Sequence, residues 1–292
     1  MPGGGGPPAS LARRLGLAEA QARLLAGRHV ALGKFDALHT GHRALAAAAS
    51  TAGPPALLSF AGMAEVLGWE RRLPLTAPVD RPRVLARHWA PHCGGRTPAE
   101  AALPFAGIRG LGPEEFVELL AELGVRGLVC GANYRFGFRA AGTAADLVAF
   151  GEARGLRVAV LDLVADPDVG GAAPVSSSRV RELVGRGEMA GVQRCLGRPY
   201  RLLGPAAAAA GGGLALPAGG ALNLVPAAGE YRCQVGVAGP GGGEAGAEAG
   251  AEARVTIGPD AGVAVELLQG GRAPPPGPGA LLAIDFEEDN LG

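Results

Sequence analysis

The sequence predicts an α/β fold with a Rossmann-like parallel sheet, followed by a smaller β domain. Two observations carry this prediction. From residue 29 to about residue 162, short apolar runs alternate with amphipathic segments, which is typical of βαβ units around a parallel sheet. After Tyr200 the sequence changes to loops rich in glycine and proline between short alternating runs. With 292 residues and 48% apolar content, the chain is long enough for two cores.

In the first domain we expect strands over residues 29–33, 56–60, 127–131 and 156–161. Helices are expected over residues 41–50, 78–89, 113–123 and 143–154, and a further helix begins at the serine run 176–178. Pro113 suits the first turn of its helix, where the missing N–H is not needed. The predicted boundaries are an N-terminal extension over 1–26, a first domain over 27–200 and a second over 201–292.

The second domain is expected to contain short strands over residues 231–237, 253–257, 263–267 and 281–286. The GEAGAEAGAEA stretch (243–253) has no β-branched or aromatic residue that could pack in a sheet. We therefore expect it to be a flexible loop between two strands.

Composition excludes several functions. The formal net charge is zero and the basic residues are scattered, so nucleic acid is not an expected partner. No run of 18 apolar residues exists, so no membrane span is expected. The four cysteines form no CxxC pair, which argues against a zinc site and a disulfide framework. RHWAPHC (87–93) lacks a fourth metal ligand and is better interpreted as a turn after a helix. The sequence does not indicate an oligomeric state.

The strongest chemical signal is His39-Thr40-Gly41-His42, which follows an apolar strand and stands at the start of a helix. A helix N-terminus presents backbone N–H groups and a partial positive charge, so it attracts phosphate. Gly41 allows close approach of a nucleotide, and both imidazoles can donate to phosphate oxygens. This context favours a phosphate site over two histidines that only cap the helix.

Two residues beside this motif are further candidates. Lys34 is the single lysine among 27 basic residues. Its survival in an arginine-biased sequence suggests a site that needs a compact ammonium, although chance survival is the alternative. Asp36 is predicted to orient a histidine or bind Mg²⁺, or else to cap a turn.

A second constellation is SSSRVR, in which Ser176, Ser177 and Ser178 stand at a helix start. Serines commonly cap helices, which is the structural alternative. Arg181 is predicted in the first turn, where the helix dipole disfavours a cation unless an anion such as a triphosphate compensates it. We therefore favour a site for an anion such as a triphosphate over a purely structural role for this segment.

A third constellation, GANYRFG (131–137), follows the strand 127–131 at the carboxyl end, where open sheets bind ligands. Its aromatic residues can accommodate an isoalloxazine ring, or they can be core residues of a tight loop.

In this order, GKFDALHTGH, GANYRFG, SSSRVR and LGRPY resemble the FAD synthetase (FMN adenylyltransferase) family over roughly residues 29–203. GKFDALH, SFAGMAEVLGWE, DRPRVL and LNLVPAAGEYRC resemble the plant plastid type. The resemblance implies a nucleotidyltransferase with ATP and FMN as substrates and Mg²⁺ as cofactor, in the chloroplast stroma, with the cytoplasm as the alternative. The arginine-containing N-terminus supports a plastid address only weakly. The resemblance implies these ATP-binding residues: Gly33, Phe35, His39, Gly41, His42, Ser176, Ser177, Ser178 and Arg181. It directs Asn133, Tyr134, Arg135 and Phe136 toward FMN, with Asn133 also at Mg²⁺.

Two departures qualify the resemblance. Bacterial bifunctional relatives carry FxPHP after the second strand, whereas Phe60-Ala61-Gly62-Met63 stands here, so those flavin contacts do not transfer. Bacterial relatives also attach a riboflavin kinase barrel with a GxPTAN motif. The nearest match, residues 215–220, lacks its threonine and asparagine. We therefore expect a degenerate β-barrel without riboflavin kinase activity.

The predicted reaction is an in-line attack of the FMN phosphate on the α-phosphorus of ATP, with His39, His42 and Arg181 as the catalytic residues. Lys34 is predicted to help Arg181 hold the β- and γ-phosphates. Three alternative functions remain open at this point: a nucleotidyltransferase that acts on another phosphate ester, a bifunctional riboflavin kinase and FAD synthetase, and a flavin-nucleotide-binding protein without turnover.

Overall fold

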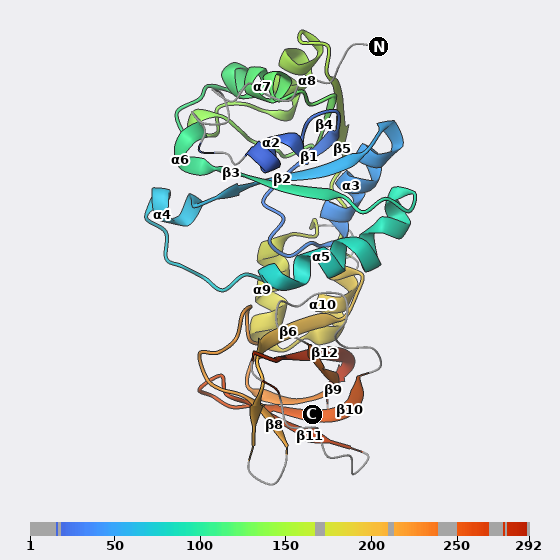
Figure 1. The fold of residues 1–292 in the computed structure, drawn as a ribbon, viewed down its shortest axis with the longest axis vertical. Coiled ribbons are helices and arrows are strands. Elements are labelled where there is room, and N and C mark those ends of the chain that lie inside the picture. Colours follow the sequence, from blue (N-terminus) through green and yellow to red (C-terminus); the bar gives the residue numbers. More distant parts are fainter. Residues whose placement is uncertain are drawn as a thin grey trace. The chain divides into compact units, whose positions relative to one another are not determined.

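A computed structural model describes residue 16 and residues 19–166, 173–209, 213–238, 250–268, 277 and 279–290 (Figure 1). The chain divides into two compact units. Unit 1 comprises the described residues of Met1–Phe35, Gly41–Arg71 and Leu85–Val164, and unit 2 those of Asp36–Thr40, Arg72–Val84 and Ala165–Gly292. Each unit contains one sheet, so the predicted α/β class with a smaller β domain is confirmed.

The sheet of unit 1 has five parallel strands in the order β3-β2-β1-β4-β5. These strands are β1 (His29–Leu32), β2 (Pro55–Ala61), β3 (Ala99–Pro104), β4 (Gly127–Gly131) and β5 (Arg157–Leu161). The four predicted strands are confirmed. The prediction missed β3, whose sequence AEAALP has no β-branched or aromatic residue. Its place at the sheet edge tolerates Pro104.

Helices cover both faces of this sheet. Figure 1 shows α7 (Pro113–Glu122) and α8 (Ala144–Glu152) on one side and α3 (Thr40–Ala52) on the other. Shorter helices complete the unit: α2 (Glu19–Arg23), α4 (Met63–Leu67), η3 (Ala90–Cys93), α6 (Phe105–Ile108) and η4 (Phe138–Ala140). Thr143 and Asp146 form a capping box that begins α8 at the predicted place.

The prediction of one regular α-helix over residues 78–89 is wrong, because the structure has three short helical segments of different types there. A 3₁₀ turn η1 (Pro78–Asp80), one α-turn α5 (Arg81–Arg83) and a π-helical turn η2 (Val84–Trp89) succeed one another there. Pro78 stands at the first helical position, where the missing N–H is not needed, but Pro82 has no N–H to donate to the Pro78 carbonyl, which interrupts a regular hydrogen-bond ladder.

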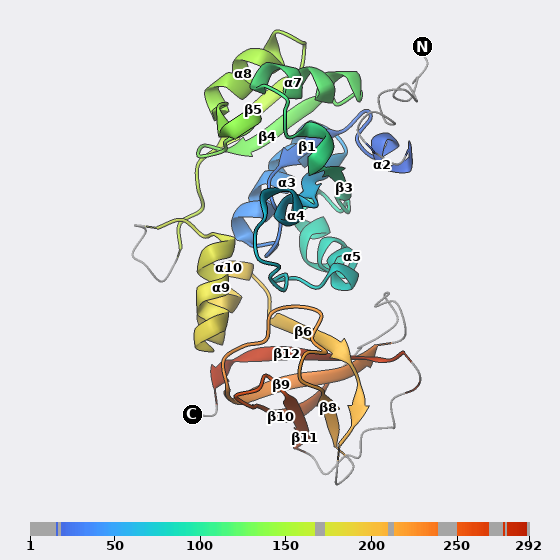
Figure 2. The ribbon, with the colours of Figure 1, turned by 90° about the vertical axis from the view of Figure 1, so that its left-hand side faces the viewer.

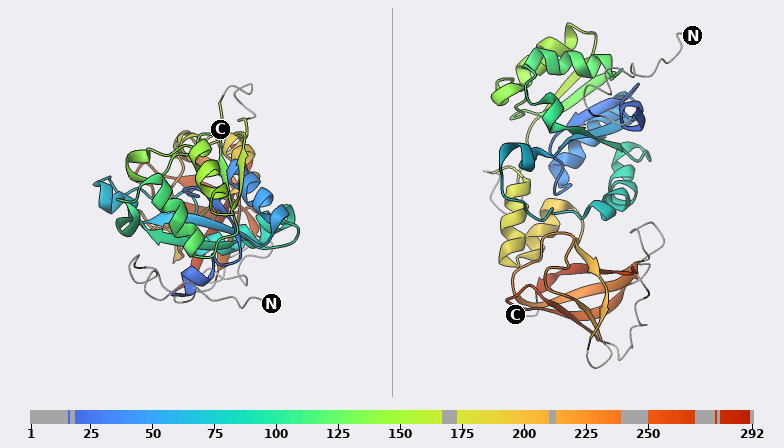
Figure 3. Two further views of the ribbon diagram at one scale, coloured as in Figure 1. Left: turned by 90° about the horizontal axis from the view of Figure 1, so that it is seen from above. Right: turned by 60° about the vertical axis from the view of Figure 1, so that its left-hand side comes forward.

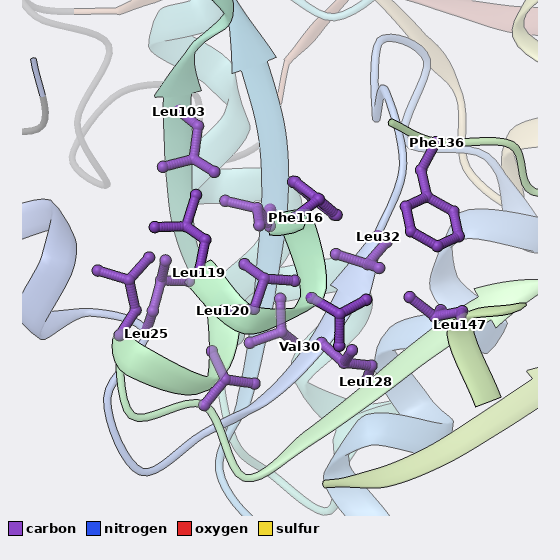
Figure 4. Packing of buried hydrophobic residues seen from close by; sticks show 14 of the residues in the cluster. Leu25, Val30, Leu32, Leu103, Phe116, Leu119, Leu120, Leu128, Phe136 and Leu147 are labelled. Atoms are coloured by element: carbon purple, nitrogen blue, oxygen red, sulfur yellow. The ribbon is translucent and has the colours of Figure 1, made fainter. Parts of the chain in front are cut away.

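A hydrophobic core cluster of unit 1 lies between the sheet and α7 (Figure 4). Alternate residues of the strands, such as Val30 and Leu32, point into it because successive side chains of a strand face opposite sides. Ala22 of α2 and Leu25 belong to the same cluster. The described part of the predicted extension 1–26 therefore packs with the sheet, and the rest of it lies outside the described residues.

The sheet of unit 2 has seven antiparallel strands in the order β6-β12-β9-β10-β11-β8-β7 (Figure 2). The strands are β6 (Tyr200–Pro205), β7 (Ala207–Ala208), β8 (Leu214–Leu216), β9 (Gly229–Ala238), β10 (Ala251–Ile257), β11 (Val263–Leu267) and β12 (Leu281–Asn290). The two edge strands, β6 and β7, are separated by one residue. The sheet must therefore curl back on itself, and it forms a nearly closed barrel (Figure 3).

The four strands predicted in this domain are confirmed, whereas β6, β7 and β8 were missed. They are short and contain glycine, proline and alanine, and β6 and β8 pair with β12 and β11, which lie far along the chain. Residues 251–253 begin β10, so the predicted loop 243–253 is wrong at its end. Residues 243–249 lie outside the described residues.

Two helices precede the barrel, α9 (Ser177–Arg186) and α10 (Met189–Leu196). The predicted helix at the serine run is α9, and α10 was missed. The helices pack on each other, and α10 also packs on β12. In the part of the chain that the structure describes, no helix is both long and apolar enough to span a bilayer.

Candidate active site

The carboxyl ends of β1 and β4 mark the place where unit 1 can receive a ligand. From β1 the chain winds through β2 to β3 at one edge, and from β4 it winds to β5 at the other. Adjacent strands from which the chain winds in opposite directions leave a crevice beyond their carboxyl ends, where open α/β sheets bind ligands. HTGH follows β1 and GANYRFG follows β4. The topology therefore places two of the three predicted motifs after adjacent strands.

The HTGH motif forms the start of α3, a helix of 13 residues. Thr40 is its first residue, and Gly41 and His42 follow in the first turn. The first-turn N–H groups have no carbonyl partners within the helix, so this end can receive a phosphate. The prediction of a helix N-terminus after a strand is thus confirmed, whereas phosphate binding stays a prediction.

Phe35 shapes the turn that leads to this helix. Its backbone has a φ of 51°, a left-handed conformation that costs energy for a residue with a side chain, and its ring is fully buried. The ring lies 4.9 Å from the ring of His42, centroid to centroid. A Cβ on Gly33 would lie 3.2 Å from the same ring. A side chain at position 33 would therefore press on the Phe35 ring, which packs beside His42.

His39 is buried in unit 2, with 6% of its surface exposed. Burial and the nearby Arg198 guanidinium lower its pKa from 6.5 to about 4. At neutral pH, His39 is therefore an uncharged imidazole that donates through one ring nitrogen. A neutral imidazole still carries one N–H, so the prediction that His39 donates to a phosphate oxygen stays a prediction.

The low pKa of His39 predicts a pH-dependent stability. An unfolded chain takes up a proton on His39 below pH 6.5, while the folded chain resists until about pH 4. The stabilisation is therefore complete above pH 6.5 and is lost as pH falls from 6.5 to 4, by about 3 kcal/mol in total. Urea unfolding from pH 7 to pH 4 should show this loss in the wild type and a shallower dependence in His39→Gln. The exposed His92→Gln is the matched control. Equal slopes for wild type and His39→Gln would contradict the assignment.

Asp36 and Arg181 form an ion pair in unit 2. The Arg181 guanidinium donates to one Asp36 oxygen at 2.9 Å, and the Leu75 N–H donates to the other at 2.9 Å. Arg181 is the fifth residue of α9, not a first-turn residue as predicted. Its negatively charged partner within the chain is Asp36, whereas the sequence favoured a triphosphate in that role. Asp36 therefore holds Arg181 and Leu75, and the predicted first-turn position of Arg181 is wrong.

The serine run has a clear structural role. Ser176 caps α9 by accepting the Arg179 N–H at 3.1 Å, as the structural alternative stated. Ser177 and Ser178 are the first two helical residues. The Arg179 side chain pairs with the fully buried Asp166 at 2.9 Å. These contacts fix the start of α9 and leave ATP binding by the serines a prediction.

In GANYRFG the aromatic residues are core residues, which was the second of the two interpretations. Phe136 is buried and packs on Phe116, and Tyr134 stacks on Phe136 with ring centroids 5.8 Å apart. Burial raises the pKa of Tyr134, and its buried hydroxyl has no hydrogen-bond partner among the described residues. The Arg135 guanidinium donates twice to the Ala140 carbonyl, at 3.0 and 2.7 Å. Asn133 is exposed immediately after β4.

Lys34 is exposed in the segment between β1 and α3. Its ammonium lies 5.2 Å from the centroid of the Trp69 ring, a cation–π distance. Trp69 itself is 53% exposed and follows α4, which has left-handed glycines at both ends, Gly62 and Gly68. The segment after β2, where FxPHP is absent, thus presents an exposed aromatic ring over the single lysine.

Metal-ligating side chains do not gather in the described part of the chain, where no three His, Cys, Asp or Glu residues form a group that could hold a metal ion. All four cysteines are buried, and none forms a disulfide.

Sequence reasoning missed three residues that support the loop Asp36–Thr40 of unit 2. Arg198 and Thr76 both contact the Ala37 carbonyl, and the fully buried Asn223 donates to the Leu75 carbonyl at 3.3 Å. The signals available were weak: an arginine in LGRPY between two helix-breaking residues, and an asparagine inside the apolar run 221–225.

No protein-family model matches the chain. FAD synthetase 2, chloroplastic, of Arabidopsis thaliana is 48% identical over 190 residues, which are 61% of this chain and 52% of that protein. FAD synthetase 1, chloroplastic, of the same plant is 42% identical over 225 residues, which are 71% of this chain and 63% of that protein. The chain thus spans from about half to just under two thirds of the length of these relatives.

Among solved structures, a macrolide-efflux protein from Streptococcus pneumoniae is similar with a TM-score of 0.71 and 21% identity, over 90% of this chain and 85% of that chain. At this identity the likeness shows the fold alone, a parallel-sheet domain with a barrel. The sequence likeness is more specific and agrees with the motifs. This chain is therefore a relative of the chloroplastic FAD synthetases of Arabidopsis thaliana, as its motifs predict.

Proposed function

We propose that this chain transfers the AMP of ATP to FMN, giving FAD and pyrophosphate. The observation that carries the proposal is the HTGH turn at the start of α3, after β1 and beside β4, where the winding of the sheet reverses. The names of the two relatives support FMN and ATP as the substrates. We assign this activity to residues 27–200.

In the proposed reaction, a phosphate oxygen of FMN forms a bond to the α-phosphorus of ATP. The bond from that phosphorus to the bridging oxygen breaks, and pyrophosphate leaves with the electron pair. The attacking group belongs to the substrate, so no protein nucleophile is required, and catalysis consists of positioning and charge stabilisation.

The chain supplies hydrogen-bond donors and positive charge for this reaction. His42 and the first-turn N–H groups of α3 stabilise charge on the α-phosphate, and neutral His39 donates one hydrogen bond. Arg181 and Lys34 hold the β- and γ-phosphates. Gly33 and Gly41 permit close approach of the nucleotide, and Ser176, Ser177 and Ser178 complete the proposed ATP contacts.

Mg²⁺ is proposed to arrive with ATP and to neutralise charge on its phosphates. A metal that comes with the nucleotide needs only one or two protein ligands. The exposed amide of Asn133 is the proposed protein ligand, because the Asp36 carboxylate already binds Arg181 and Leu75.

We propose that the flavin ring stacks on Trp69. The ring of Trp69 is exposed on the segment that replaces FxPHP, and stacking on an aromatic side chain contributes about 1–3 kcal/mol for a nucleobase. Trp69→Leu should therefore raise the Kd for FMN about tenfold in a titration of FMN fluorescence. Phe138→Leu is the comparison, since Phe138 is also exposed and also has a cation, Arg139, 5.2 Å from its ring. A loss confined to Phe138→Leu would move the flavin to the loop after β4.

The barrel of unit 2 is proposed to lack riboflavin kinase activity. Residues 215–220 lie at the end of β8 and in the turn after it, without a threonine or asparagine. Asn223, shortly after them, uses its amide group within the unit: it accepts the Leu203 N–H and donates to Arg201, Tyr200 and Leu75.

To test this proposal, the purified chain is incubated with Mg²⁺-ATP and with either FMN or riboflavin. The flavins are then separated by chromatography. FAD from FMN without FMN from riboflavin is the expected result. FMN from riboflavin would show a working kinase. Absence of FAD, with FMN still bound, would favour a flavin-binding protein without turnover.

We also propose a plastid location, because both relatives are named chloroplastic. Imaging of a full-length fluorescent fusion tests it, and a cytosolic signal would overturn it.

A further inference from the structure

The loop that carries His39 belongs to unit 2 and not to the unit of the parallel sheet. Residues Asp36–Thr40 group with residues 72–84 and with the chain from residue 165 onward. Leu38 in this loop has a φ of 50°, and its backbone needs support to keep that left-handed conformation. The groups that hold the loop therefore determine where the His39 imidazole lies.

Arg198 supplies that support from the junction between α10 and β6. Its guanidinium is buried and donates to the carbonyls of Leu38 at 2.7 Å and Ala37 at 3.0 Å. It also donates to the Leu196 carbonyl at 3.4 Å and to the Thr76 hydroxyl at 3.3 Å. Ala37 and Leu38 immediately precede His39. The planar Arg198 guanidinium, which has five N–H donors, therefore fixes the backbone that leads into His39.

Thr76 and Asn223 extend this support. The Thr76 hydroxyl donates to the Ala37 carbonyl at 3.1 Å, so Ala37 accepts from two side chains. Asn223 is fully buried and binds both Leu75 and the first barrel strand. The barrel is thus connected through Leu75, Thr76 and Arg198 to the His39 loop by hydrogen bonds within one unit.

We propose that Arg198 is a positioning residue through which the junction between α10 and β6 fixes the His39 loop within unit 2. The barrel is then retained as a support for the adenylyl-transfer site and not as a kinase. This inference rests on the proposed function for its kinetic consequence, while the position of His39 can be measured without turnover.

The charge of Arg198 provides a spectroscopic readout. Arg198 helps to lower the pKa of His39, second to burial. Other ionisable groups around this loop include Asp36 and Arg181, which pair with each other, and Tyr200, whose pKa is raised chiefly by burial. Replacing Arg198 by methionine removes the cation and leaves the Asp36–Arg181 pair, so the titration midpoint of His39 should rise.

The experiment compares wild type with Arg198→Met, Arg198→Lys and Thr76→Val, and with Arg254→Met as a control on the exposed face of β10. The His39 imidazole signal, assigned with His39→Gln, is titrated by NMR, and kcat and KM are measured for FAD formation. We expect a higher His39 midpoint in Arg198→Met and a kcat lower by on the order of 10²-fold, with KM values within about threefold of wild type. Arg198→Lys should recover part of kcat, Thr76→Val should lose less, and Arg254→Met should match wild type.

An unchanged His39 signal and an unchanged kcat in folded Arg198→Met would overturn the proposal. Where Arg198→Met does not fold, Arg198→Lys and Thr76→Val decide: wild-type shifts and rates in both would overturn it. Failure of the proposed function is a separate result, namely no FAD from the wild type, and in that case the NMR titration alone confirms or overturns the role of Arg198.

Discussion

His42→Ala is expected to lower kcat for FAD formation by about 10²–10³-fold, equivalent to about 3–4 kcal/mol of transition-state stabilisation. The effect is large because His42 lies in the first turn of α3, where the backbone already favours negative charge, and because Phe35 holds its ring from behind. The charge that builds up on the α-phosphate and on pyrophosphate would lose a positioned donor. Steady-state kinetics with saturating Mg²⁺-ATP and FMN measure the change.

Two further variants test whether this loss is specific to His42. His42→Asn keeps a donor of similar reach and should recover part of the rate. His92→Ala removes an exposed histidine of unit 1 and should leave kcat unchanged. A wild-type rate in His42→Ala would remove His42 from the catalytic residues and would weaken the assignment of the α3 N-terminus as the phosphate site.

Asp80→Ala is expected to cost about 3 kcal/mol of unfolding free energy, because it breaks the largely buried ion pair with Arg83 and leaves Arg201 paired with Asp285 alone. Asp80 is 5% exposed and accepts from Arg83 through Nε at 2.6 Å and Nη2 at 2.8 Å. Arg201 lies 3.9 Å from the same carboxylate and pairs at 2.7 Å with Asp285 of β12. This network joins the segment after α4 to two barrel strands within unit 2.

Urea unfolding at pH 7 measures this loss. Asp162→Ala, which removes an exposed aspartate, should change the unfolding free energy by no more than about 0.5 kcal/mol. If Asp80→Ala were as stable as Asp162→Ala, the arginines would have found other partners or water, and the network would not stabilise the unit.

The local part of the candidate site was predictable because its signals lie close together in the sequence. An apolar run before Gly33 predicts a strand, and HTGH predicts the start of the next helix. Ser176 behaves as the N-cap that its residue type predicts. Packing decided between the two interpretations of GANYRFG, because Tyr134 and Phe136 pack in the core. The irregular backbone of residues 78–89 was predicted wrongly, although Pro82 is a local signal for it.

By itself, the sequence determined the order of strands and helices around β1 and β4 and the relationship to the chloroplastic FAD synthetases, because periodicity, caps and motifs are local properties of the chain. Only the tertiary structure showed that Asp36 pairs with Arg181, 145 residues away, and that Arg198 holds the Ala37 carbonyl across 161 residues. Such contacts depend on how the chain packs over its whole length. Many backbone carbonyls could accept from a buried guanidinium, and the sequence around the arginine does not indicate which of them it will bind.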